Sequence, residues 1–154
     1  MIRYVLAVVL MVTLVALSIP AIQHGATVQS DRQLERDVAE LDRAATSLVD
    51  HEDQTPDTHP SPHRAVTITL PDDSLTSAPV EHFEIERTSA NTSVVTVLLD
   101  GSSPSTTVID APIVHATPTA NRSVELGGTG TETELVLRLE RDPAGTDVVV
   151  ATRV

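Results

Sequence analysis

The chain has 154 residues, and its 22 acidic side chains oppose ten basic ones, all arginine, for a formal net charge of −12. A charge of that size repels nucleic acid and anionic surfaces, which excludes nucleic acid as a partner of the acidic part. Cysteine is absent and Tyr4 and Phe83 are the only aromatic residues, so disulfides, cysteine-bearing zinc sites and stacking platforms are excluded as well.

The first predicted element is an apolar helix over residues 4–22, which carry no charge. About 19 helical residues cover about 28 Å, close to the thickness of a bilayer, and Arg3 precedes them. We therefore expect a transmembrane anchor within residues 1–25, ending near Pro20, in a single-pass protein of the cell membrane with its C-terminal domain extracellular. The alternative for residues 1–25 is a secretory signal peptide with a cleavage site near Ala16 and Ser18.

An amphipathic helix is expected next, over residues 26–49. Ser30 and Gln33 have the spacing of a helix-capping pair, so we expect the helix to begin there. Apolar residues then recur at intervals of three and four and form one stripe, called the seam: Leu34, Val38, Leu41, Ala45 and Leu48. The seam either packs on the chain's own downstream domain or forms a stalk, or it joins a helical bundle with neighbouring subunits.

Residues 50–64 are predicted to be a linker, because three prolines fall in a stretch with almost no apolar side chain. Its histidines, His51, His59 and His63, lie among aspartates and could bind zinc or copper. No ordered helix fixes their geometry, so we interpret them as solvated linker residues and assign no metal ligand.

Residues 65–154 show the alternation of β-strands. Strands are expected at 66–70, 83–86, 94–99 and 124–126, and a further strand at 108–114 is interrupted at Pro112. The clearest hairpin joins Leu135–Leu139 to Val148–Val150 through Pro143 and Gly145. The predicted fold class is α+β: a transmembrane helix continuing into an amphipathic helix, then a small β-sandwich or barrel-like domain.

No pattern in the chain indicates catalysis or a cofactor. The glycines at 127, 128 and 130 precede a strand rather than a helix, which favours a hairpin turn over a phosphate-binding loop. A G-x-S-x-G motif is absent. The acidic pairs, Asp72 with Asp73 and Glu84 with Glu86, are interpreted as hydrated patches rather than calcium ligands. We expect a protein that is not an enzyme.

Both asparagines of the chain, Asn91 and Asn121, stand in N-glycosylation sequons between predicted strands. They are possible glycosylation sites, and they favour an exposed, exterior β-domain.

The layout of an Arg3-led apolar helix, an acidic amphipathic helix, a proline-rich break and a Thr/Val-rich strand domain resembles an uncharacterised haloarchaeal membrane-protein family associated with type IV pilus or secretion components. The opening residues 1–10 and the strand Leu135–Leu139 carry this resemblance. The architecture is also similar to that of pilins, although no glycine or basic leader precedes the apolar run.

The resemblance implies a non-enzymatic surface protein that is an accessory, pilin-like component of such an assembly, with membrane and protein partners. The alternative is an anchored extracellular module that binds a metal ion or another ligand.

Overall fold

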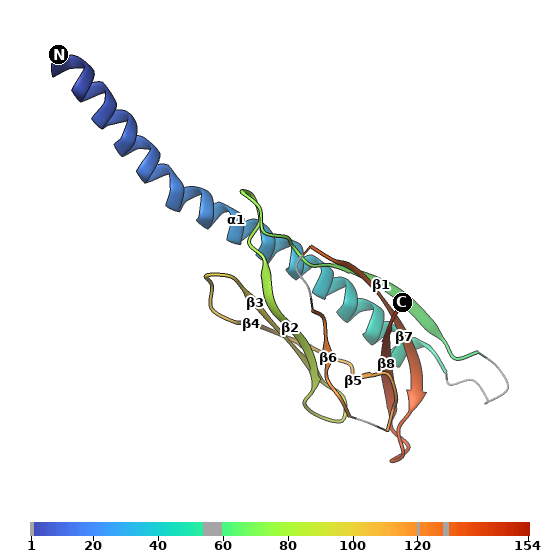
Figure 1. Cartoon of the computed structure of the whole chain (residues 1–154). Helices are drawn as coiled ribbons and strands as arrows, with labels where there is room; N and C mark the ends of the chain where they lie inside the picture. The colour runs from blue at the N-terminus through green and yellow to red at the C-terminus, as the bar shows by residue number, and fades with distance from the viewer. Residues whose placement is uncertain (1, 54–59, 120, 128–129) are drawn as a thin grey trace.

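The computed structural model of the chain describes residues 2–53, 60–119, 121–127 and 130–154, and for residues 19–23 it describes the backbone alone. A single helix, α1 (Ile2–His51), leads into a β-sandwich (Figure 1). The helix runs without a break past Pro20 and through the two segments that were expected to be separate. The prediction that a helix begins at Ser30 is therefore wrong. The Ser30 hydroxyl instead accepts a hydrogen bond from the Ala78 amide at 2.9 Å, and Gln33 donates to the Thr69 carbonyl at 3.3 Å.

The sandwich consists of two four-stranded sheets. One sheet has the order β1-β7-β8-β5, formed by His63–Thr69, Glu132–Arg141, Asp147–Arg153 and Ile113–His115. The other has the order β4-β3-β2-β6, formed by Ser105–Ile109, Ser93–Leu99, Val80–Arg87 and Val124–Glu125. Neighbouring strands are antiparallel except β5 and β8, which are parallel. The predicted hairpin between β7 and β8 is confirmed, with Leu137 opposite Ala151.

The expected strand 108–114 is two strands in different sheets. β4 ends at Ile109 and pairs with β3, whereas β5 begins at Ile113 and pairs with β8. Proline has no N–H to donate to a ladder, and Pro112 lies where the chain leaves one sheet for the other. The crossing is fixed by Ser93, which is fully buried and whose hydroxyl donates to the Ala111 carbonyl at 2.8 Å and accepts from the Ile113 amide at 2.7 Å.

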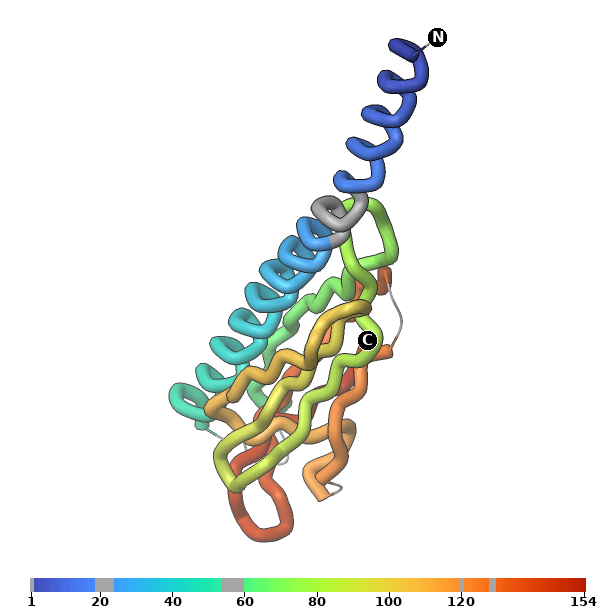
Figure 2. The backbone as a smooth tube through the Cα atoms, turned by 90° about the vertical axis from the view of Figure 1, so that its left-hand side faces the viewer, coloured from blue at the N-terminus to red at the C-terminus, as the bar shows by residue number. Residues whose placement is uncertain are grey.

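The C-terminal part of α1 closes the side of the sandwich at which β1 and β4 are the edge strands. It contacts β1, β7 and β8 of one sheet and β3 and β4 of the other, and it lies along this side in Figure 2. The seam faces the space between the sheets and joins their core, since its five residues, Leu34, Val38, Leu41, Ala45 and Leu48, are 0–4% exposed. Of the two uses left open for the seam, packing on the chain's own domain is therefore correct.

The predicted transmembrane anchor and the single-pass membrane location are wrong. Among the residues that the structure describes, no helical stretch is both long and apolar enough to cross a bilayer.

An ion pair joins the two sheets at the end of the sandwich away from the N-terminus. Arg87, at the end of β2, lies 3.4 Å from Asp142 in the β7–β8 turn, and the two side chains are 14% and 10% exposed. The amides of Thr146 and Ala144 donate to the same carboxylate, both at 2.9 Å. These hydrogen bonds, that of Thr146 foremost, outweigh its desolvation and with Arg87 hold the pKa of Asp142 below its ordinary value.

Because the pKa of Asp142 is lower in the folded than in the unfolded chain, its carboxylate stabilises the fold above the ordinary aspartate pKa and ceases to do so as the pH falls through the folded pKa. We expect Asp142→Asn to cost stability at neutral pH, and the difference from wild type to shrink below about pH 4. Urea unfolding between pH 3 and 7 measures this, with the exposed Asp110→Asn as the control. A difference that stays constant down to pH 3 would contradict the assignment.

Candidate functional site

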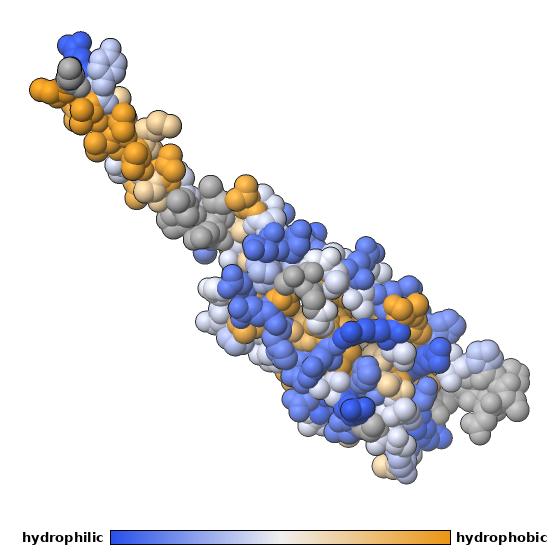
Figure 3. All heavy atoms as spheres, viewed as in Figure 1, coloured by the Kyte–Doolittle hydropathy of each residue, from blue (hydrophilic) through white to orange (hydrophobic). Residues whose placement is uncertain are grey.

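The N-terminal part of α1 protrudes from the sandwich and is apolar (Figures 1 and 3). Residues 2–17, called the apolar half, carry twelve large hydrophobic side chains that are each 54–80% exposed: Ile2, Tyr4, Val5, Leu6, Val8, Val9, Leu10, Met11, Val12, Leu14, Val15 and Leu17. Isolated exposed hydrophobic residues are common on proteins, but a contiguous apolar surface of this extent marks an interaction site.

The apolar half has no polar face. Successive residues of a helix are rotated by about 100°, so the run Val8, Val9, Leu10, Met11 and Val12 points in every direction around the axis. The hydroxyls of Thr13 and Ser18 donate to carbonyls four residues earlier, both at 2.8 Å, and so turn inward to the helix backbone. A helix that is hydrophobic all round is buried in its working environment, in contrast to an amphipathic helix on a protein surface.

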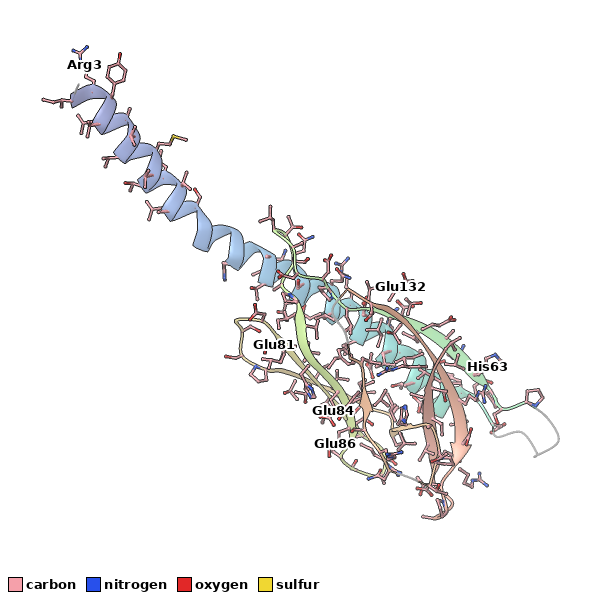
Figure 4. The ribbon with its side chains drawn as sticks, viewed as in Figure 1. Arg3, His63, Glu81, Glu84, Glu86 and Glu132 are labelled. Carbon is pink, nitrogen blue, oxygen red and sulfur yellow. The ribbon has the colours of Figure 1, made fainter. Side chains whose placement is uncertain are left out.

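The charges are distributed in the opposite way. Arg3 marks the far tip of α1, and every acidic residue of the chain lies from Asp31 onward. In Figure 4 Glu81, Glu84 and Glu86 follow β2 along the sandwich and Glu132 lies at the start of β7. The molecule therefore has, at one end, an apolar rod whose only charged side chain is Arg3 and, at the other end, a strongly acidic body.

A groove lies where α1 meets the sandwich, and we call it the neck groove. Its volume is about 760 Å³, and its walls come from α1 and from the β1–β2 and β3–β4 loops. It is lined by His24, Ala26, Thr27, Asp73, Ser74, Leu75, Ser77, Ala78, Pro79, Asp100 and Gly101. The side chain of Leu75 is 84% exposed, more than any other large hydrophobic side chain that the structure describes.

A second, polar groove of about 760 Å³ lies beside β6 and the end of β8. It is lined by Glu86, His115, Asn121, Arg122, Ser123, Glu125 and Arg153. Its polar groups already engage one another. The Ser123 hydroxyl is the main cause that lowers the pKa of Glu84, the Arg153 guanidinium donates to the Glu125 carbonyl, and the His115 amide donates to the Arg122 carbonyl at 3.0 Å.

The structure does not bring the other predicted site residues together. Asn91 and Asn121 are exposed in loops that follow β2 and β5, and Asn121 lies at the edge of the polar groove. His51 ends α1 and His63 begins β1, whereas His59 lies outside the described residues. Within the described part of the chain no three His, Asp or Glu side chains come together as a metal site would require.

A model for a domain of unknown function, DUF7311, matches residues 1–154. The chain belongs to the DUF7311 family. No curated protein and no solved structure matches the chain. Because the match covers α1 and both sheets, the protruding helix and the sandwich belong to one DUF7311 domain.

Sequence reasoning missed Leu75 in this DUF7311 chain. The sequence pattern in this loop indicated only a hydrated acidic patch at Asp72 and Asp73. The available signal was a single large apolar residue inside an otherwise polar loop, Asp72 to Ser77. Such a residue has no periodic partners, so pattern analysis cannot tell a buried loop anchor from an exposed contact.

Proposed function

We propose that this chain is a non-enzymatic, pilin-like subunit or accessory component of a pilus or secretion assembly, which it joins by packing the apolar half of α1 against the same segment of neighbouring copies. The exposure of twelve large hydrophobic side chains around the full circumference of the protruding helix carries the proposal. The resemblance to pilins, in which an apolar helix continues into a β-rich head, points the same way.

The energy available from such packing is sufficient for assembly. Fully burying one Val, Leu or Ile side chain contributes roughly 1.5–3 kcal/mol. Since the twelve side chains are already partly shielded by their own helix, together they offer on the order of 10–20 kcal/mol per copy. Association costs about 4–15 kcal/mol in lost freedom. A single partner helix covers only one side of the rod, so several copies are needed to bury it all round.

The charge distribution favours association of copies through the apolar half rather than through their acidic bodies. All 22 acidic residues lie from Asp31 onward, beyond the protruding part of α1, so two such acidic bodies repel each other. The apolar half carries no charge beyond Arg3 at its tip, and it stands clear of the sandwich in both views of the chain (Figures 1 and 2). Neighbouring rods can therefore pack together while the acidic bodies remain at the periphery.

The test compares wild type with the double variant Leu6→Asp and Leu10→Asp. In molar salt, which screens the acidic bodies to about 3 Å, we expect wild type to form multimers and the variant to remain monomeric, since a carboxylate is costly to bury in an apolar bundle. Sedimentation velocity without detergent measures the mass distribution. Thermal unfolding of both proteins shows whether the sandwich is intact.

The matched control is Val108→Asp with Val154→Asp, which places the same two charges on exposed aliphatic positions of the sandwich, 60% and 82% exposed. This control should assemble as wild type does. A monomeric wild-type chain, whether free or bound to phospholipid vesicles, would overturn the proposal, as would a helix variant that assembles normally.

A further inference from the structure

We propose that the turn carrying Leu75, residues 72–77, is a second contact surface of the assembly, where Leu75 packs against the apolar half of a neighbouring copy's α1. This inference rests on the proposed function and adds to it the contact that orients one copy relative to the next. Its first observation is the exposure of Leu75, 84% in an otherwise polar loop. Burial of an exposed leucine side chain is favourable, and the residues of its own loop do not bury Leu75.

The turn is held in one conformation by its own hydrogen bonds. The Ser74 hydroxyl accepts from the amides of Ser77 at 3.1 Å and Thr76 at 3.3 Å, and the Ser74 amide donates to the Ser77 carbonyl at 3.1 Å. The Ser77 hydroxyl in turn donates to the Asp72 carbonyl at 2.8 Å. Leu75 therefore stands at the tip of a closed turn, so little conformational entropy is lost when it binds.

Two further elements fix the turn relative to the helix. The Ala78 amide, just after the turn, donates to the hydroxyl of Ser30, which is fully buried on α1. On the other side the Gly130 amide donates to the Pro71 carbonyl at 3.4 Å. Gly130 has a φ of +68°, and a Cβ at this position would come within 3.0 Å of the Asp72 Cβ. The loop before β7 thus packs closely against the turn, and the position of Leu75 is set by α1 and by this loop together.

The location of the turn indicates which segment of a neighbouring copy it contacts. The β1–β2 loop lies beside α1 at the point where the helix leaves the sandwich, and Figures 1 and 2 agree on this. Leu75, Ala26 and Thr27 line the neck groove together, so the surface around Leu75 continues onto α1. A neighbouring helix that packs along the apolar half passes this groove.

Charge restricts what can occupy the groove. Asp73 and Asp100 line the neck groove together with Leu75, so an acidic body of another copy is repelled there. The uncharged segment of a neighbour, residues 4–22, brings no such repulsion. The apolar half has side chains of one kind on all sides and cannot fix the rotation of one copy about another. Leu75, whose loop lies beside α1 on one side only, supplies that direction.

The first experiment measures assembly of Leu75→Ala and Leu75→Asp in the full chain. Because burying a leucine is worth roughly ten- to a hundredfold in affinity, we expect Leu75→Ala to raise the concentration of half-assembly by about that factor and Leu75→Asp to raise it further. Val108→Ala and Val108→Asp are the controls on another exposed residue. Urea unfolding, measured in the background of Leu6→Asp with Leu10→Asp so that association does not contribute, should be unchanged for all four.

A second experiment uses the absence of cysteine from the natural chain. We expect copies with Leu75→Cys, mixed with copies with Leu17→Cys, to form an intermolecular disulfide on mild oxidation, whereas Val108→Cys copies should not cross-link to Leu17→Cys. Normal assembly of the Leu75 variants without cross-linking would overturn this inference and leave the proposed function standing. A wild-type chain that never assembles would overturn both.

Discussion

Truncation of Leu41 to alanine should lower the free energy of unfolding by about 2–5 kcal/mol, because it leaves a cavity in a packed core. Leu41 is fully buried on α1 and belongs to the core cluster that both sheets share. A domain of this size has only about 5–15 kcal/mol of total stability, so the variant should lose a large part of it. Urea unfolding in molar salt, followed by circular dichroism, gives the difference.

The measurement is made in the background of Leu6→Asp with Leu10→Asp, so that association does not add to the stability of the folded state. Leu75→Ala is the matched control, since it removes the same atoms from an exposed position and should change the free energy by less than about 0.5 kcal/mol. Equal effects of Leu41→Ala and Leu75→Ala would mean that the C-terminal part of α1 does not complete the core.

The seam shows what sequence periodicity can and cannot predict. Spacings of three and four from Leu34 to Leu48 predicted a helix with one buried face, and that face is buried. The same spacing is compatible with a stalk, a bundle or the chain's own domain, because periodicity describes one element and not its partner. The partner became clear only when β1 and β4 proved to be edge strands on the same side of the sandwich, where a helix can close the core.

Ser30 shows why the helix boundaries were wrong. A serine followed by Gln33 has the spacing of a capping pair, and locally that interpretation is sound. The group that the hydroxyl binds is the amide of Ala78, 48 residues away, so the serine fills a buried position on the helix face rather than beginning the helix. Interactions at this separation leave no local pattern.

The same limit applies to the candidate site. The apolar half was evident from composition, because residues 4–22 lack charge. Its assignment to a membrane followed from the missing charge, the length of the run and Arg3 before it, whereas no described helical stretch is both long and apolar enough to cross a bilayer. Leu75 gave no periodic signal, and its relevance comes from a turn and a groove formed by three separate segments. Non-local geometry, rather than residue type, defines this contact.

Replacement of Ser93 by alanine should lower the free energy of unfolding more than the loss of any other hydroxyl that the structure describes. The Ser93 hydroxyl binds the Ala111 carbonyl and the Ile113 amide, and all three residues are fully buried. Alanine leaves both backbone groups without this partner, away from water. Since an unsatisfied buried polar group costs about 1–3 kcal/mol, we expect a loss of roughly 2–4 kcal/mol in the free energy of unfolding.

Ser93→Ala should destabilise the sheet crossing locally, in addition to lowering the global stability. Residues 109–113 carry the chain from β4 in one sheet to β5 in the other, and the Ser93 hydroxyl bridges that crossing from the start of β3. The Ile113 amide should therefore exchange with deuterium faster in Ser93→Ala than the global loss of stability explains, whereas amides of the β7–β8 hairpin should follow the global loss. Ser105→Ala, on the exposed part of β4, is the control and should change stability by less than about 0.5 kcal/mol. If the two serine variants were equally stable, the sheet crossing would be held by the packing around Pro112 and not by the hydroxyl of Ser93.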